Sequence, residues 1–213
     1  MGKRKRFFAG TRLGDLAGDV AGRQVAWTEE WHGAPTHREA PADFISLIQE
    51  QHRRNFDLWH EEDTARAPEV PDNLIASVKR RIDKLNQERN DLIEKLDDAL
   101  ATLLQEKGTA PAADAPWNTE TPGSVIDRLS IMSLKVHHMR EQAQREDVDR
   151  AHKMRCTKKL RVLEQQRADL VSALQLLLGD LLAGRKQLKL YRQFKMYNDP
   201  TLNPEIYGKR KKQ

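Results

Sequence analysis

Two long segments of the sequence carry apolar residues every three or four positions, and this spacing constrains the fold more than any other feature. The segments span residues 72–107 and 153–190. Such spacing places the apolar side chains on one face of an α-helix, which is buried against other helices. The aromatic content is only 6%, and Leu, Glu, Lys, Arg, Gln and Ala fill the middle of the chain. The sequence therefore predicts an all-α fold.

An internal repeat relates the two segments. Shifting the chain by 78 positions aligns Leu92 with Leu170 and brings a Gln-x-Arg-x-Asp-Leu sequence in each segment into register. Long helices that short loops join to a partner helix lie antiparallel to that partner. The repeat therefore predicts two helical hairpins, residues 43–107 and 121–190, packed as an antiparallel four-helix bundle.

Glycine, proline and capping residues indicate where this bundle begins and ends. Residues 1–41 are rich in Gly and Pro and are predicted to form an irregular N-terminal arm. Residues 191–213 are predicted to be a C-terminal tail with a basic end, which leaves residues 42–190 for the bundle. Thr121 is a predicted N-cap, and Pro122 occupies the first position of the third helix.

Composition narrows the compartment and the partners. A single cysteine, Cys156, excludes an internal disulfide and is typical of a reducing compartment. No run of about twenty apolar residues occurs, so no transmembrane segment is expected. The formal net charge is +5, but much of the excess lies at residues 3–6 and 209–212, so nucleic acid is not an expected partner. These features predict a cytoplasmic protein.

Two arginines interrupt the apolar faces of the long helices. Arg89 and Arg167 stand at repeat-related positions where the spacing calls for an apolar side chain. A buried guanidinium needs a carboxylate partner, and folding the hairpins places Arg167 level with Asp127. Two interpretations stay open. The pair either fixes the register of the helices, or it belongs to an anion or substrate site to which the start of the third helix contributes free backbone N–H groups.

Polar and cationic residues gather at the start of the third predicted helix and at the end of the fourth. These two places lie towards the same end of an antiparallel bundle, so we expect a ligand-binding pocket there. The carboxylates of the set favour the hydroxyl groups of a sugar over a phosphate ion alone, because they repel an anion. The predicted pocket residues are Glu120, Ser124, Asp127, Arg128, Arg167, Tyr191, Arg192 and Lys195.

The first predicted helix has a polar inward side, and its polar residues are His52, Asn55, His60, Glu62 and Asp63. His60 and Asp63 are three positions apart, and the repeat offers His138 and Glu141 at the same spacing, which is one possible metal site. Metal-binding carboxylate bundles use the reverse order, Glu-x-x-His, with further glutamates from the other helices. In this sequence the other two helices carry Arg89 and Arg167 instead of further glutamates. No cofactor is therefore predicted, and the metal site is kept as an alternative.

Four longer stretches resemble a bacterial family known only as a domain of unknown function. They are NFDLWHEEDTAR (55–66), KRRIDKLNQERNDLIEKLD (79–97), NTETPGSVIDRLSIMSLKVHHM (118–139) and YRQFKMYNDPTLNP (191–204). The resemblance covers most of the chain from Phe44 onward. Members of that family are encoded beside sugar transferases of the heptosyltransferase kind, so the resemblance implies an association with surface-polysaccharide synthesis and no defined activity.

Three kinds of function remain open at this point. The first is a binding or accessory protein for a sugar phosphate, a nucleotide sugar or a glycosyltransferase. The second is an enzyme, either a transferase or hydrolase with Glu120 or Asp127 as base, or a metal enzyme with His60 and Asp63. The third is a scaffold that forms a homodimer or docks a partner through an exposed leucine seam within residues 96–104 and 174–188.

Overall fold

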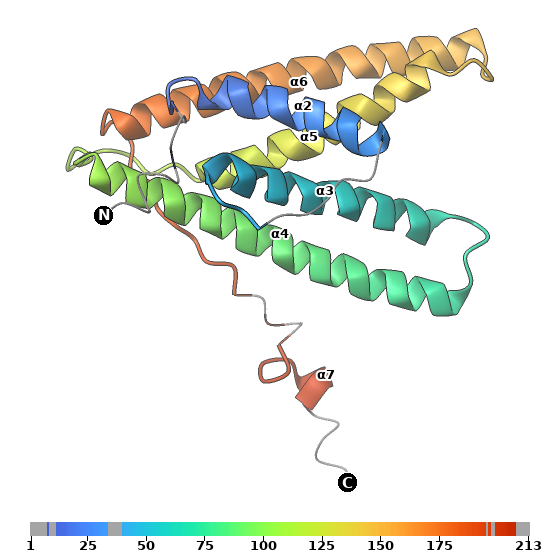
Figure 1. Cartoon of the computed structure of the whole chain (residues 1–213), viewed down its shortest axis with the longest axis horizontal. Coiled ribbons are helices and arrows are strands. Elements are labelled where there is room, and N and C mark those ends of the chain that lie inside the picture. The colour runs from blue at the N-terminus through green and yellow to red at the C-terminus, as the bar shows by residue number, and fades with distance from the viewer. Residues whose placement is uncertain (1–7, 9–11, 34–39, 195, 197–198, 208–213) are drawn as a thin grey trace.

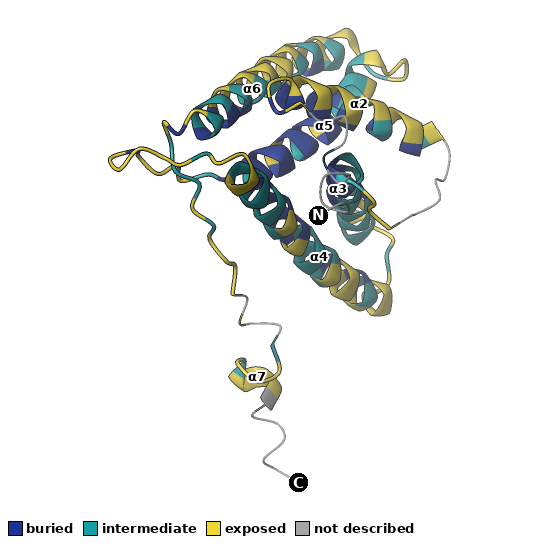
Figure 2. Cartoon of the chain, turned by 60° about the vertical axis from the view of Figure 1, so that its left-hand side comes forward, coloured by how far each residue is buried: buried dark blue, intermediate teal, exposed yellow. Residues whose placement is uncertain are grey.

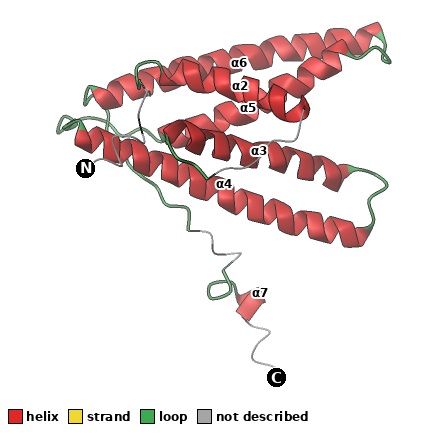
Figure 3. Ribbon diagram, in the orientation of Figure 1, coloured by secondary structure: helices red, strands yellow, loops and turns green. Residues whose placement is uncertain are grey.

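The structure, a computed structural model, describes residues 8, 12–33, 40–194, 196 and 199–207. These residues form helices and no β-strand, which confirms the predicted all-α fold (Figure 1 and Figure 3). None of the described helices combines the length and apolar character that crossing a bilayer requires. In chain order the helices are α2 (Leu16–Gly33), α3 (Phe44–Arg66), α4 (Asp72–Glu106), α5 (Pro122–Gln144), α6 (Arg150–Leu182) and α7 (Pro204–Tyr207).

The bounds of the four central helices follow the internal repeat. α3 and α5 begin 78 positions apart and end 78 positions apart, and α4 and α6 also begin 78 positions apart. In both hairpins the second helix is longer than the first, with 35 residues in α4 against 23 in α3 and 33 in α6 against 23 in α5. The repeat in the sequence is therefore a repeat of structure.

An additional helix, α2, occupies 18 residues of the predicted N-terminal arm. The prediction that residues 1–41 are irregular is wrong for α2, whose inward face buries Leu16, Val20, Gln24 and Trp31 at helical spacing. Glycine favours loops, with a cost of about 1 kcal/mol per residue in a helix. The α2 glycines lie on its exposed face, where burial of the opposite face outweighs that cost.

α5 is the central helix of the molecule. It contacts α2, α3, α4 and α6, and Figure 2 shows it largely in the colour of buried residues. α2 lies against α5 and α6 and also touches α3. The predicted four-helix bundle therefore becomes an arrangement of five long helices in which α2 covers part of the second hairpin.

Close contact with α4 fixes the start of α5. Thr121 is the N-cap and accepts a 3.2 Å hydrogen bond from the backbone N–H of Ser124, as predicted. The backbone N–H of Gly123 donates to Asp97 Oδ1 at 2.7 Å. A Cβ atom at Gly123 would lie 2.8 Å from that oxygen and 2.8 Å from the carbonyl oxygen of Ile93, so only glycine fits. The N–H groups that were predicted to be free for an anion are thus used within the chain.

Several leucines of the predicted seam lie in the core, whereas Leu176 is 70% exposed. Leu96 and Leu174 are fully buried, and their neighbours Leu100 and Leu178 are 1% and 2% exposed. They pack with residues of α2, α3 and α5 in one apolar cluster. The prediction of an exposed leucine seam that forms a dimer is therefore wrong for these residues.

Candidate functional site

Polar side chains of α2, α3 and α5 meet in the interior and form one hydrogen-bonded network. A buried polar group is tolerated when its hydrogen bonds are made, so such a network requires matched donors and acceptors. Its buried members are Gln24, Thr28, Gln51, His52, Asn55, Asp127 and Ser130. The sequence predicted the inward positions of His52 and Asn55 and named Asp127, and it missed Gln24, Thr28, Gln51 and Ser130.

His52 is held neutral at the centre of this network. The Thr28 hydroxyl donates to the carbonyl of Gln24 at 2.7 Å, so it accepts from His52 Nε2 at 3.0 Å. His52 Nδ1 then accepts from the Ser130 hydroxyl at 2.7 Å, and Ser130 Oγ accepts from Asn55 at 2.9 Å. Complete burial lowers the pKa of His52 to about 3, because the charged imidazolium loses its hydration.

Asp127 is the buried carboxyl group of the same network. Its Oδ1 accepts from Gln51 Nε2 at 2.6 Å and from Asn55 Nδ2 at 2.8 Å, and it lies 3.7 Å from Arg89 Nε. Burial raises the pKa of Asp127, while Arg89 and the two amides offset part of that rise. Asp127 therefore joins α5 to both α3 and α4.

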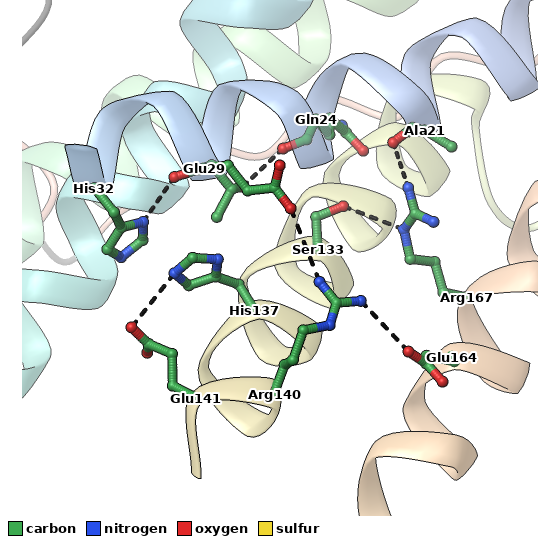
Figure 4. Close-up of polar contacts among 11 residues, drawn as sticks. Ala21, Gln24, Glu29, His32, Ser133, His137, Arg140, Glu141, Glu164 and Arg167 are labelled. Atoms are coloured by element: carbon green, nitrogen blue, oxygen red, sulfur yellow. Dashed lines mark hydrogen bonds and ion pairs between the residues drawn. The ribbon is translucent and has the colours of Figure 1, made fainter. Parts of the chain in front are cut away.

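Arg89, and not Arg167, is the partner of Asp127. Arg167 is half-buried on the other side of α5, where its guanidinium donates to the carbonyl oxygen of Ala21 and, at 3.3 Å, to Ser133 Oγ (Figure 4). The predicted pairing of Arg167 with Asp127 is therefore wrong. The reason is α2, which brings a backbone carbonyl to Arg167.

The other acidic and hydroxyl residues of the predicted pocket bond locally at the start of α5. Arg128 donates to both carboxylate oxygens of Glu120 at 2.7 Å, and both side chains are exposed. Ser124 belongs to the helix cap with Thr121. Arg128 also lines a cleft shared with Gln166 and Asp169 of α6, whereas Arg167 is bonded to α2 and to Ser133.

In the C-terminal tail, Arg192 lies against α4. Arg192 forms salt bridges with Asp98 at 2.6 Å and with Glu94 at 3.1 Å. Tyr191 is exposed, and Lys195 lies outside the described residues. The structure therefore distributes the predicted pocket residues over separate surfaces and does not gather them into one cavity.

A pocket of about 390 Å³ opens beside the polar network, between α3, α4 and α5. Arg89 lies at this pocket, and its Nε has no hydrogen-bond partner within the described part of the chain. Three residues from the predicted polar side of the first helix, Asn55, Glu62 and Asp63, line the same pocket. The polar and aromatic lining residues are Asn55, Trp59, Glu62, Asp63, Arg66 and Arg89.

Comparison with known proteins places this region within a recognised family. A family model described as "Protein of unknown function (DUF4254)" matches residues 45–190, more than half of the chain. The chain belongs to this family. The resemblance found in the sequence is thereby confirmed. A search of curated proteins and a search of solved structures each find no significant match.

The DUF4254 region contains α4, α5, α6 and nearly all of α3, and hence Arg89, Asp127 and the pocket. It also contains His60 and His138, the two histidines of the metal site that the sequence analysis kept as an alternative. His60 and His138 lie near each other, with ring centroids 6.1 Å apart, and Glu141 accepts from His138 Nδ1 at 2.8 Å. Asp63, in contrast, is exposed at the pocket.

Two further histidines, which the sequence interpretation missed, complete this group in the DUF4254 protein. His32 lies at the end of α2, before the matched region, and its ring stacks on His137 with centroids 4.1 Å apart (Figure 4). Burial, reinforced by the neighbouring His32, lowers the pKa of His60 and of His137. We call His32, His60, His137 and His138 the histidine cluster.

Proposed function

We propose that this protein binds a phosphorylated sugar in the pocket between α3, α4 and α5, as a binding or accessory protein in cell-surface polysaccharide or sugar-nucleotide metabolism. One observation carries the proposal. Arg89 lines a pocket of about 390 Å³, and its buried Nε, 3.7 Å from Asp127 Oδ1, makes no hydrogen bond within the described residues. That volume lies in the range of about 300–1,000 Å³ typical of small-molecule sites.

The charge distribution around Arg89 supports a phosphorylated sugar over a simple anion. Its guanidinium is the natural donor for a phosphate, which it binds through two parallel hydrogen bonds. Glu62 and Asp63 would repel a small anion that filled the pocket, but their oxygens accept from the hydroxyl groups of a sugar. Trp59 adds an aromatic surface suited to the apolar side of a sugar ring.

The pocket beside Arg89 is a better candidate than the larger cleft between α5 and α6. That cleft has a volume of about 590 Å³ and includes Arg128, Lys135, Gln166 and Asp169. All four of these side chains are exposed to solvent. A ligand in that cleft would exchange hydration for contacts of similar strength. Arg89 is already largely removed from water, so a ligand that hydrogen-bonds its guanidinium displaces less hydration.

Thermal denaturation of the full chain tests the proposal. Monosaccharide phosphates and nucleotide sugars are screened beside the unphosphorylated sugars and inorganic phosphate. A ligand at about one hundred times its dissociation constant adds about 2.7 kcal/mol to the free energy of unfolding. We expect a phosphorylated sugar to raise the Tm of the wild type, and neither the sugar nor phosphate alone to match it.

The repeat supplies a matched control for this screen. Arg89→Gln should abolish the Tm rise, whereas Arg167→Gln changes the equivalent residue of the other hairpin and should retain it. Asp63→Asn alters an exposed pocket residue without disturbing the core and should weaken binding. The proposal would be refuted if no phosphorylated sugar raised the Tm of the wild type. It would also be refuted if Arg89→Gln and Arg167→Gln lost the ligand-induced Tm rise equally.

A further inference from the structure

The histidine cluster joins three helices at one end of the polar core. His32 comes from α2, His60 from α3, and His137 and His138 from α5. One ligand atom each from His32, His137 and His138 lies within 4.8 Å of the others. Helices from distant parts of the sequence therefore bring three imidazole groups to a single point.

Hydrogen bonds on the far side of two rings orient their remaining nitrogens. His32 Nδ1 donates to the backbone carbonyl of Thr28 at 2.7 Å, and His138 Nδ1 donates to Glu141 Oε2 at 2.8 Å. Each bond fixes the proton on Nδ1 and leaves a lone pair on Nε2. Metal-binding histidines typically have this second hydrogen bond, to a carbonyl or a carboxylate.

Three nitrogens of the cluster are shielded from water and lack a hydrogen bond. The Nε2 atoms of His32, His137 and His138 have no hydrogen-bond partner among the described residues, although Glu141 Oε1 lies 3.6 Å from that of His137. Phenylalanine would pack equally well without a buried polar atom. Unpaired nitrogens at one point therefore indicate a ligand that accepts their lone pairs.

Aromatic neighbours hold the rings of the cluster in place. Trp59 stacks on His138 with centroids 4.7 Å apart and planes 12° from parallel. Phe56 packs edge-on against His32 at 4.8 Å and against His60 at 4.5 Å. Rings with restricted rotation lose little freedom when they bind an ion.

We propose that His32, His137 and His138 form a binding site for a divalent late transition-metal ion, with Zn²⁺ as the representative. Neutral imidazole suits Zn²⁺, Ni²⁺ and Cu²⁺, whereas Mg²⁺ and Ca²⁺ require oxygen ligands. Zn–N bonds of about 2.1 Å place tetrahedral ligand nitrogens about 3.4 Å apart, so small ring rotations close the site. Glu141 holds His138 in orientation, and a fourth coordination position remains beside His60.

Metal binding by the full chain tests this inference directly. Purified protein is incubated with Zn²⁺ or with Co²⁺, passed through a desalting column and analysed for retained metal. We expect one bound ion per chain and a visible absorption spectrum for the Co²⁺ form. His137→Gln should abolish retention, and Glu141→Gln should weaken affinity about 10–100-fold, as for other second-shell partners of a metal ligand.

His152→Gln is the matched control. This residue lies on α6, where His152 Nε2 is 3.3 Å from the Cys156 thiol, and the pair is the obvious competing metal site. Retention in His152→Gln together with loss in His137→Gln supports the cluster. No retained metal in the wild type, or loss only in His152→Gln, overturns the inference.

A measurement on the wild type avoids any question of misfolded variants. Zn²⁺ should shift the imidazole ¹⁵N resonances of His32, His137 and His138 in NMR spectra and leave those of the buried His52 unchanged. Unchanged cluster resonances at saturating Zn²⁺ would exclude the site. Arg89→Gln should bind Zn²⁺ like the wild type, so failure of the sugar-phosphate proposal would leave the metal result intact.

Discussion

The two hairpins share their helix bounds and their Gln-x-Arg-x-Asp-Leu sequence, yet their equivalent arginines have different partners. Arg89 in α4 faces the carboxyl group of Asp127, whereas Arg167 in α6 donates to a backbone carbonyl of α2. The local sequence therefore determines where a helix begins and which face is buried. The helix packed against that face determines what a buried cation binds.

Position 127 differs most between the hairpins. The repeat equivalent of Asp127 is Gln49, which does not share its complete burial. Asp127 supplies a carboxyl group to Arg89, whereas Arg167 of the second hairpin binds a backbone carbonyl of α2. α2 is thus part of what makes the second hairpin stable, and it introduces an asymmetry into the duplicated fold.

Asp127→Ala should have the largest effect on stability. The substitution removes the hydrogen-bond acceptor of Gln51 and Asn55 and the charged partner of Arg89, and breaking a buried charged pair costs about 3–5 kcal/mol. The equivalent change in the first hairpin, Gln49→Ala, should cost less than about 0.5 kcal/mol. Urea unfolding of both variants measures the difference. Equal losses would show that the hairpins are not distinguished at this position.

The pH dependence of Asp97→Asn comes next. Burial raises the pKa of Asp97 from 3.8 to about 6, so its folded form favours the proton and stability falls as pH rises through this range. Asparagine mimics the protonated group and matches the uncharged Gln175 at the equivalent position. Asp97→Asn should therefore be more stable than the wild type by up to about 3 kcal/mol at pH 7. The difference in unfolding free energy between Asp97→Asn and the wild type should disappear below pH 4. A difference that does not change with pH would contradict the raised pKa of Asp97 as its cause.

Gly123→Ala should test the close approach of α4 to α5. Its Cβ would contact Asp97 and the Ile93 carbonyl at 2.8 Å, so the helices must separate, at a cost of about 1–3 kcal/mol. The equivalent residue of the first hairpin is Ile45, so this close approach of α4 to α5 has no glycine counterpart at the start of α3. A Tm equal to that of the wild type would contradict the contact.

Gly179→Ala should give the smallest effect, in the opposite direction. Beyond its own stretch of helix, no atom of the described residues lies within 4 Å of a Cβ built at Gly179, and the equivalent residue of α4 is already Ala101. Alanine in a helix interior is favoured over glycine by about 1 kcal/mol. Thermal unfolding should show a Tm a few degrees higher, and a decrease would indicate a contact of this face outside the described residues.

Much of the architecture could be predicted from the sequence because it depends on local patterns. The apolar spacing located α4 and α6, and Thr121 with Pro122 marked the start of α5. α2 was missed because its glycines resemble a loop, although Leu16 and Val20 already had helical spacing. Packing of α2 against α5 and α6 determines that these glycines are helical. The local sequence does not specify that packing.

The candidate sites were harder to predict for the same reason. His52 and Asn55 could be assigned to the interior, but Gln24 and Thr28 came from the helix that was missed. His138 and Glu141 were recognised from the repeat, while His32 has no repeat-related signal. Partners separated by about a hundred residues follow from how the hairpins dock, which spacing alone does not define.

The hydrogen bond between His52 and Ser130 joins two positions that are themselves equivalent, since 78 residues separate them. Two identical hairpins meeting here as a homodimer would place either two imidazoles or two hydroxyls opposite each other. Only a single polypeptide with two independent copies can place a different residue on each side. Fusion of the hairpins into one gene product therefore allows a directional proton arrangement, from Asn55 through Ser130 and His52 to Thr28, that a symmetric assembly of the same unit cannot have.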